Sequence, residues 1–142
     1  IIFKEFILHS FSFLDLSKLK NVELSEYEAF IEVPEKVYQG FILGLFCNVF
    51  DRYEVKSNRE SGLCRFDIML LPRNNRGKGI MIEIKMANKD DLESTSRKAL
   101  KQIEDKKYLV ELKDMEIKEA ILLGIAFYGK ECFITHSDLK EL

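Results

Sequence analysis

Residues 80–86, with the sequence IMIEIKM, constrain the fold more than any other segment of the chain. Glu83 and Lys85 stand between four apolar side chains, those of Ile80, Ile82, Ile84 and Met86. Because successive side chains of a β-strand point to opposite faces, this alternation predicts a strand with one apolar face. The other face carries the two charged residues.

A second apolar run, LCRFDIMLL at residues 63–71, precedes this strand. The intervening PRNNRGKG is rich in turn-forming residues, so the two runs predict an antiparallel β-hairpin. The first run is apolar on both faces, which is typical of a central strand covered on two sides, and Asp67 interrupts it. Pairing across the turn sets Asp67 opposite Glu83, with Lys85 on the same face.

Three ionisable side chains therefore meet on the predicted sheet. Two carboxylates in a partly buried place repel each other unless they share a cation. Mg²⁺ is usually held by one or two carboxylates together with phosphate oxygens, so we expect Asp67 and Glu83 to bind Mg²⁺ or Mn²⁺. An ammonium group beside such an ion can stabilise charge on a phosphate, the role expected of Lys85. The residues alone leave open an alternative, a surface ion-pair cluster.

A helix is predicted before the hairpin. Pro34 and Glu35 fit a helix start, and apolar residues follow at helical spacing at Val37, Phe41, Leu45, Phe46 and Val49. Gly40 and Gly44, four residues apart, are expected to let another element approach closely.

The remaining segments predict one more helix and further strands. Tyr53 and Val55 indicate a short strand, and AILLGIAFYG and ECFITH indicate two strands joined near Gly129. A long helix beginning at Asp91 has an apolar face at Leu92, Ala99, Ile103 and Val110. This order predicts the α/β class, a mixed β-sheet flanked by helices.

The 142 residues, 46% of them hydrophobic, suit one compact domain. We assign residues 34–136 to its core and residues 1–33 to a helical lead-in. The chain starts with Ile rather than Met, inside an apolar run, so we expect a C-terminal fragment of a longer protein. The opening segment carries too many polar residues for a signal peptide or a membrane span. Three cysteines without disulfide or zinc spacing are expected to be reduced, as in a cytoplasmic protein.

The formal net charge of −2 predicts no overall attraction to nucleic acid. Between Arg52 and Lys89, however, nine Lys or Arg residues stand against four Asp or Glu residues. We expect Arg59 and Arg65 to contact substrate phosphate, with ion pairs to neighbouring residues as the alternative, and the hairpin cations to line the approach to the site. The hairpin cations are Arg73, Arg76 and Lys78.

The combination of SNRESGLCRFDIMLLP, GKGIMIEIK and ALKQIEDKKY resembles the PD-(D/E)XK nuclease superfamily, from roughly Glu35 to Lys130. More narrowly, it resembles the nuclease-like domain found C-terminal to an AAA-type ATPase-like module in bacterial and archaeal proteins. The resemblance implies a restriction-endonuclease-like core. It also implies that Asp67, Glu83 and Lys85 are the acidic residue and the E-x-K motif that bind metal and assist hydrolysis.

The resemblance implies two further site residues. Glu35 is the candidate for the Glu of the first core helix, with Glu32 as a competitor. On the helix after E-x-K, Gln102 and Tyr108 match a Gln and a Tyr of the branch that resembles recombination nucleases, although their spacing does not place both on one face. The chain departs from the family at Phe66, where Pro is usual, and at Cys64, where Gly is usual, but neither change removes a ligand.

The expected activity is that of a Mg²⁺- or Mn²⁺-dependent nuclease that hydrolyses phosphodiester bonds by metal-activated water. Its expected partners are nucleic acid, DNA rather than RNA, and an N-terminal ATPase-like domain in the full-length protein, with homodimerisation left open. One alternative is a non-catalytic module that binds nucleic acid or a partner under control of that ATPase-like domain. Another is a structural domain in which the charged residues form only ion pairs.

Overall fold

The computed structural model describes residues 37–57, 60–61, 64–65, 67–74, 77–105, 112–129 and 131–140. Within them, a five-stranded sheet has the order β1-β4-β5-β6-β7. Its strands are β1 (Tyr53–Ser57), β4 (Ile68–Pro72), β5 (Gly79–Met86), β6 (Glu119–Tyr128) and β7 (Glu131–Lys140). Only β5 and β6 are parallel, and every other neighbouring pair is antiparallel. The predicted mixed sheet is therefore confirmed.

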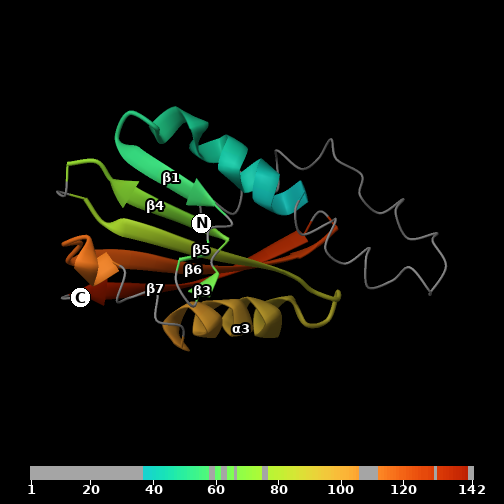
Figure 1. Ribbon diagram of the computed structural model, residues 1–142. Coiled ribbons are helices and arrows are strands. Elements are labelled where there is room, and N and C mark those ends of the chain that lie inside the picture. The colour runs from blue at the N-terminus through green and yellow to red at the C-terminus, as the bar shows by residue number, and fades with distance from the viewer. Residues whose placement is uncertain are drawn as a thin grey trace.

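Helices cover both faces of this sheet (Figure 1). Helical residues 37–45 continue into the 3-10 helix η4 (Phe46–Val49) and lie on one face. The helix α3 (Leu92–Asp105) lies on the other face and joins β5 to its parallel neighbour β6. No helix in the described part of the chain is long and apolar enough to cross a membrane. The predicted lead-in at residues 1–33 lies outside the described residues.

The alternation predicted for β5 separates two hydrophobic clusters. Ile82 and Ile84 pack with Tyr38 and Ile42 on the face of helical residues 37–45. Met81 packs with Ile103 and other residues beneath α3. Even-numbered and odd-numbered residues of β5 therefore face opposite helix layers, as the sequence predicts.

The core face predicted for the first helix is confirmed only in part, because Phe41, Leu45, Phe46 and Val49 are partly buried and pack against the hydrophobic core. Val37 is 36% exposed, whereas Tyr38 and Ile42 are buried. Apolar residues occur on several sides of this helix, so periodicity alone does not say which side meets the sheet. Gly40 and Gly44 are exposed, and a Cβ added at either position would meet no other atom within 4 Å. The expected close approach at these glycines is therefore wrong.

Tyr38 attaches helical residues 37–45 to β6 and to the turn that follows β6. Its ring stacks on Phe127 of β6, with centroids 4.2 Å apart. Its hydroxyl donates a hydrogen bond of 2.6 Å to the carbonyl oxygen of Gly129, which follows β6. Burial raises the pKa of the Tyr38 phenol. These contacts hold the helix across β5 and β6.

The apolar run at residues 63–71 is two strands rather than one. The two-residue strand β3 (Cys64–Arg65) pairs with β2 (Glu60–Ser61) in a separate ladder. The central strand β4 begins only at Ile68, so Asp67 lies immediately before it. In α3, Ala99 and Ile103 are buried as predicted, and Val110 lies outside the described residues.

Candidate active site

Asp67 lies immediately before β4, beside the middle of β5. The two strands pair with Ile68 opposite Ile82, and this register, continued by one residue, sets Asp67 opposite Glu83. The predicted register of the hairpin is confirmed. It makes neighbours on adjacent strands of two acidic residues that are sixteen positions apart in the sequence.

Both carboxylate oxygens of Asp67 accept hydrogen bonds. The backbone N–H of Ile84 on β5 donates to Oδ2 at 2.7 Å. The side-chain amide of Gln39, from helical residues 37–45, donates to Oδ1 at 2.7 Å. Backbone N–H groups of a strand point sideways within the sheet, so the carboxylate lies near the level of the sheet rather than far above either face. Asp67 and Gln39 are both buried, with 8% and 6% of their surface exposed.

Glu83 points to the α3 face of β5. The amide of Gln102 on α3 donates a hydrogen bond to Oε1. The ammonium nitrogen of Lys85 lies 3.6 Å from the same oxygen, and the second oxygen, Oε2, is shielded from solvent. The Lys85 side chain keeps 32% of its surface exposed, whereas that of Glu83 keeps 6%. The carboxylate of Glu83 is thus buried in the site, whereas the ammonium group of Lys85 is partly exposed to solvent.

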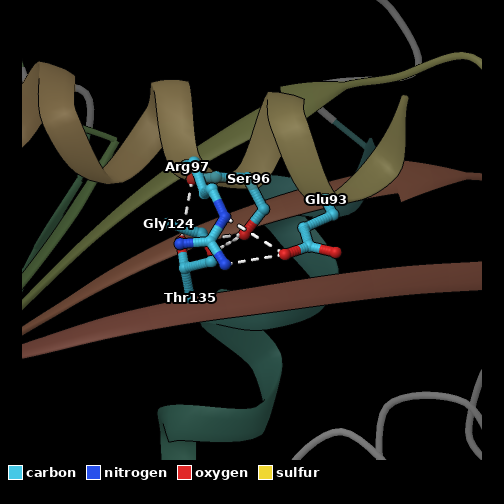
Figure 2. Close-up of polar contacts among 5 residues, drawn as sticks. All are labelled: Glu93, Ser96, Arg97, Gly124 and Thr135. Atoms are coloured by element: carbon cyan, nitrogen blue, oxygen red, sulfur yellow. Dashed lines mark hydrogen bonds and ion pairs between the residues drawn. The ribbon is translucent and has the colours of Figure 1, made fainter.

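The close approach of α3 to the sheet places Gln102 near Glu83. Glu83 pairs with Gly124 of β6, which pairs in turn with Thr135 of β7, so the three residues form one row across the sheet. A Cβ on Gly124 would lie 2.3 Å from the backbone oxygen of Ser96, so only glycine fits at this crossing. The Ser96 hydroxyl donates to the Gly124 carbonyl at 2.8 Å, and the Thr135 hydroxyl donates to the Ser96 carbonyl at 2.9 Å (Figure 2).

The exposed side of α3 carries a separate ion pair near Ser96 (Figure 2). Arg97 and Glu93, one helical turn apart, approach to 2.7 Å. Both side chains are largely exposed, so this pair contributes little to stability. The docking of α3 therefore depends on its buried side.

The donor set suits a hard divalent cation. Asp67 and Glu83 offer carboxylate oxygens from neighbouring strands, and with Lys85 the three ionised groups sum to one negative charge. Mg²⁺ typically takes one or two carboxylates and keeps several waters. Among the residues that the structure describes, no group of three or more His, Cys, Asp or Glu side chains is placed to hold a metal. A site built from these residues therefore contains two carboxylates.

Several predicted site residues fall outside this description. Glu35, Arg59 and Tyr108 are not among the described residues. The backbone of Arg65 belongs to β3, but its side chain is not described. Their expected roles stay predictions.

The hairpin cations are not beside the site, contrary to expectation. Arg73 follows the far end of β4, and Lys78 precedes β5, whereas Asp67 and Glu83 lie roughly 16–20 Å away at about 3.3 Å per residue. Lys78 contacts Glu119 at 3.4 Å and Asp138 at 3.5 Å. The prediction from nearness in sequence is wrong for Arg73 and Lys78, because an extended strand separates each of them from the site. Arg76 lies outside the described residues.

Gln39 is a site residue that the sequence analysis missed. It is the one side-chain amide in an otherwise apolar stretch, and it follows Glu35 by four residues, the spacing at which helical side chains share a face. That spacing was the available signal. Which side chain Gln39 contacts depends on how the helix packs against the sheet.

A family model of the PD-(D/E)XK nuclease superfamily matches residues 33–137. The chain belongs to this superfamily. Its mixed sheet with flanking helices is the restriction-endonuclease-like α/β fold. No curated protein matches the chain significantly, and no solved structure does either. Membership of the PD-(D/E)XK superfamily indicates a metal-dependent, hydrolytic nuclease, and the matched segment contains every described residue of the site.

Proposed function

We propose that this PD-(D/E)XK domain is a divalent-metal-dependent nuclease that hydrolyses phosphodiester bonds at Asp67, Glu83 and Lys85. One observation carries the proposal: the hairpin register and the E-x-K motif gather two buried carboxylates and one ammonium group at neighbouring strands. An ion-pair cluster with no further role would be expected on an exposed face, whereas here both carboxylates are buried.

Asp67 and Glu83 would hold the divalent ion through their carboxylate oxygens. Such an ion supplies Lewis-acid stabilisation of phosphate oxygens and lowers the pKa of a bound water. Gln102 orients Glu83 by donating to Oε1 and adds no charge. Gln102 therefore orients Glu83 without changing the net charge of the site.

Lys85 is the residue that reaches substrate. Its ammonium group is partly exposed and lies next to Glu83, so it can approach a phosphate oxygen while remaining within 3.6 Å of the carboxylate. A positive charge at this place stabilises negative charge that develops on the phosphate in the transition state. Lys85 would also neutralise part of the repulsion between substrate phosphate and the two acids.

The substrate is proposed to be DNA rather than RNA, and the metal Mg²⁺ or Mn²⁺. The excess of basic over acidic residues between Arg52 and Lys89, a segment that includes Arg59 and Arg65, supports a polyanionic substrate. The resemblance to domains that follow an ATPase-like module supports such a module as a partner in the full-length protein. Arg59 and Arg65 remain the proposed phosphate contacts.

A cleavage assay tests this function directly. Plasmid, linear duplex and single-stranded DNA, and RNA of matched length, are incubated with Mg²⁺ or Mn²⁺ and with EDTA. We expect metal-dependent cleavage of at least one substrate, lost in Asp67→Asn and Glu83→Gln. Substrate binding without cleavage in either metal would instead support a non-catalytic binding module. Equal cleavage by wild type and both variants would remove these acids from the reaction.

A further inference from the structure

The two carboxylates of the site are each held by one glutamine, and the glutamines come from opposite helix layers. Gln102 of α3 donates to Glu83 from one side of the sheet. Gln39, from helical residues 37–45 on the other side, donates to Asp67. An ionised carboxylate only accepts hydrogen bonds, so the nitrogen of the Gln39 amide is the atom that faces it.

The contact between Gln39 and Asp67 removes rotational freedom from the carboxylate. With the backbone N–H of Ile84 on Oδ2 and the Gln39 amide on Oδ1, each oxygen has a donor 2.7 Å away. The first donor belongs to the sheet and the second to a helix, so the carboxylate plane is defined from two directions. A carboxylate accepts along about four lone-pair directions in all, and a divalent cation would bind along these directions.

The chemical nature of Gln39 matters as much as its position. A lysine or arginine at this place would also hold the carboxylate, but it would neutralise the charge that attracts a cation. An amide orients the acid and leaves its charge intact.

The helix that carries Gln39 is anchored independently of Asp67. Tyr38, the preceding residue, stacks on Phe127 and donates a hydrogen bond to the Gly129 carbonyl. Ile42, one turn later, is fully buried against the sheet. The position of the Gln39 amide is therefore set by packing that does not depend on its bond to Asp67.

We propose that Gln39 is a positioning residue that orients the Asp67 carboxylate for the divalent ion. The inference deepens the proposed function and rests on it. Residues that hydrogen-bond a metal ligand typically change metal affinity by about 10–100-fold when they are substituted. A loss in that range is expected when the Gln39 donor is removed.

The test measures Mn²⁺ binding to the full chain, by isothermal titration calorimetry and by the loss of the free-ion EPR signal. Gln39→Met keeps the length and buried volume of the side chain but removes the donor. Tyr38→Phe is the matched control, because it also removes one hydrogen bond made by the same helix, in this case the part-buried bond to the Gly129 carbonyl in the turn after β6. Thermal melts of each variant define a temperature at which all are folded.

We expect the dissociation constant for Mn²⁺ to rise by about 10-fold or more in Gln39→Met and to stay at the wild-type value in Tyr38→Phe. If cleavage is observed, half-maximal activity in Gln39→Met should need correspondingly more Mn²⁺, with turnover recovered at saturation. If Gln39→Met does not fold, Gln39→Asn provides the second variant, since it withdraws the amide by about 1.5 Å.

The possible outcomes distinguish a failure of the role proposed for Gln39 from a failure of the proposed metal site. If Asp67→Asn weakens Mn²⁺ binding but Gln39→Met or Gln39→Asn behaves like Tyr38→Phe, then Gln39 is only a structural residue and the inference is overturned. If Asp67→Asn itself binds Mn²⁺ like wild type, the proposed metal site is wrong, and the inference falls with it.

Discussion

The hydroxyl of Ser96 on α3 donates a hydrogen bond of 2.8 Å to the carbonyl oxygen of Gly124 on β6. This bond marks the place where the helix lies in backbone contact with the sheet. Gly124 is the β6 partner of Glu83, and Gln102 lies further along the same helix. The depth at which α3 packs on Gly124 therefore controls whether Gln102 reaches Glu83.

Gly124→Ala should destabilise the fold and weaken the site together. The new Cβ would lie 2.3 Å from the backbone oxygen of Ser96 and 2.5 Å from the backbone nitrogen of Leu100, so the whole helix has to move. Urea denaturation should show a loss of about 3 kcal/mol, at the upper end of overpacking effects. Gly44→Ala is the control, because it is helical, exposed and unobstructed, and should stabilise by about 0.5–1 kcal/mol. Equal effects at the two glycines would contradict the close packing.

Glu83→Gln and Lys85→Ala should separate metal binding from turnover. Glu83→Gln removes a ligand charge, so calorimetry with Mn²⁺ should show a large loss of affinity. Lys85→Ala removes an ammonium group 3.6 Å from Glu83 and should retain or improve metal affinity. Its turnover should still fall by about 10²–10³-fold, because charge on the phosphate loses a stabilising partner. A parallel loss of metal binding in both variants would show that Lys85 acts through Glu83 and not on substrate.

Substrate binding should depend on Arg59 and Arg65 rather than on the hairpin. Each phosphate contact contributes about −0.9 to the slope of log affinity against log salt for duplex DNA. The double substitution Arg59→Ala with Arg65→Ala should flatten this slope. Arg73→Ala with Lys78→Ala should not, because Arg73 lies at the far end of β4 and Lys78 contacts Glu119 and Asp138. Fluorescence anisotropy across a salt series measures both, and the opposite pattern would place substrate over the hairpin.

Glu116→Gly should stabilise the protein, although it removes a side chain. Glu116 has a left-handed φ of 59°, and the bonds Glu116 N to Lys113 O and Ile117 N to Leu112 O close a Schellman turn around it. Glycine adopts this conformation without strain, at some cost in unfolded-chain entropy, so a net gain of up to about 1 kcal/mol is expected. Lys113→Gly, in the same helical turn but with ordinary helical geometry, should instead destabilise. Chemical denaturation of the pair gives the comparison.

Acid should remove the contribution of Asp91 to stability. Hydrogen bonds from the side chain and backbone of Asn88 lower the pKa of Asp91 in the folded state. A carboxyl group whose pKa is lower in the folded state stabilises the fold when the pH is above its pKa in the unfolded chain, which is near 4. This stabilisation is lost as the pH falls through the pKa of the folded state. The stability gap between wild type and Asp91→Asn should therefore be constant near neutral pH and narrow below about pH 4. Asp90→Asn, at the exposed neighbouring residue, provides the control, and a gap that widens in acid would contradict the linkage.

The sequence by itself determined the hairpin and its chemistry. The alternation of residues 80–86 assigned faces to β5, and antiparallel pairing across the turn predicted a register that puts Asp67 opposite Glu83, which the observed pairing of Ile68 with Ile82 confirms. These features are local, because a strand has a side-chain period of two and a short turn leaves few registers. The motif that matches the PD-(D/E)XK superfamily lies within this local pattern, so it could be predicted from the sequence alone.

Only the tertiary structure decided which side of the first helix is buried and which side chains complete the site. Tyr38 and Ile42, rather than Val37, face the sheet because the helix is apolar on several sides and packing selects one of them. The pairing of Gln39 with Asp67 joins residues 28 positions apart from a helix and a strand, and no spacing rule specifies such a contact. The far position of Lys78 follows from the same cause, since distance in space depends on strand direction and neighbouring elements rather than on separation in sequence.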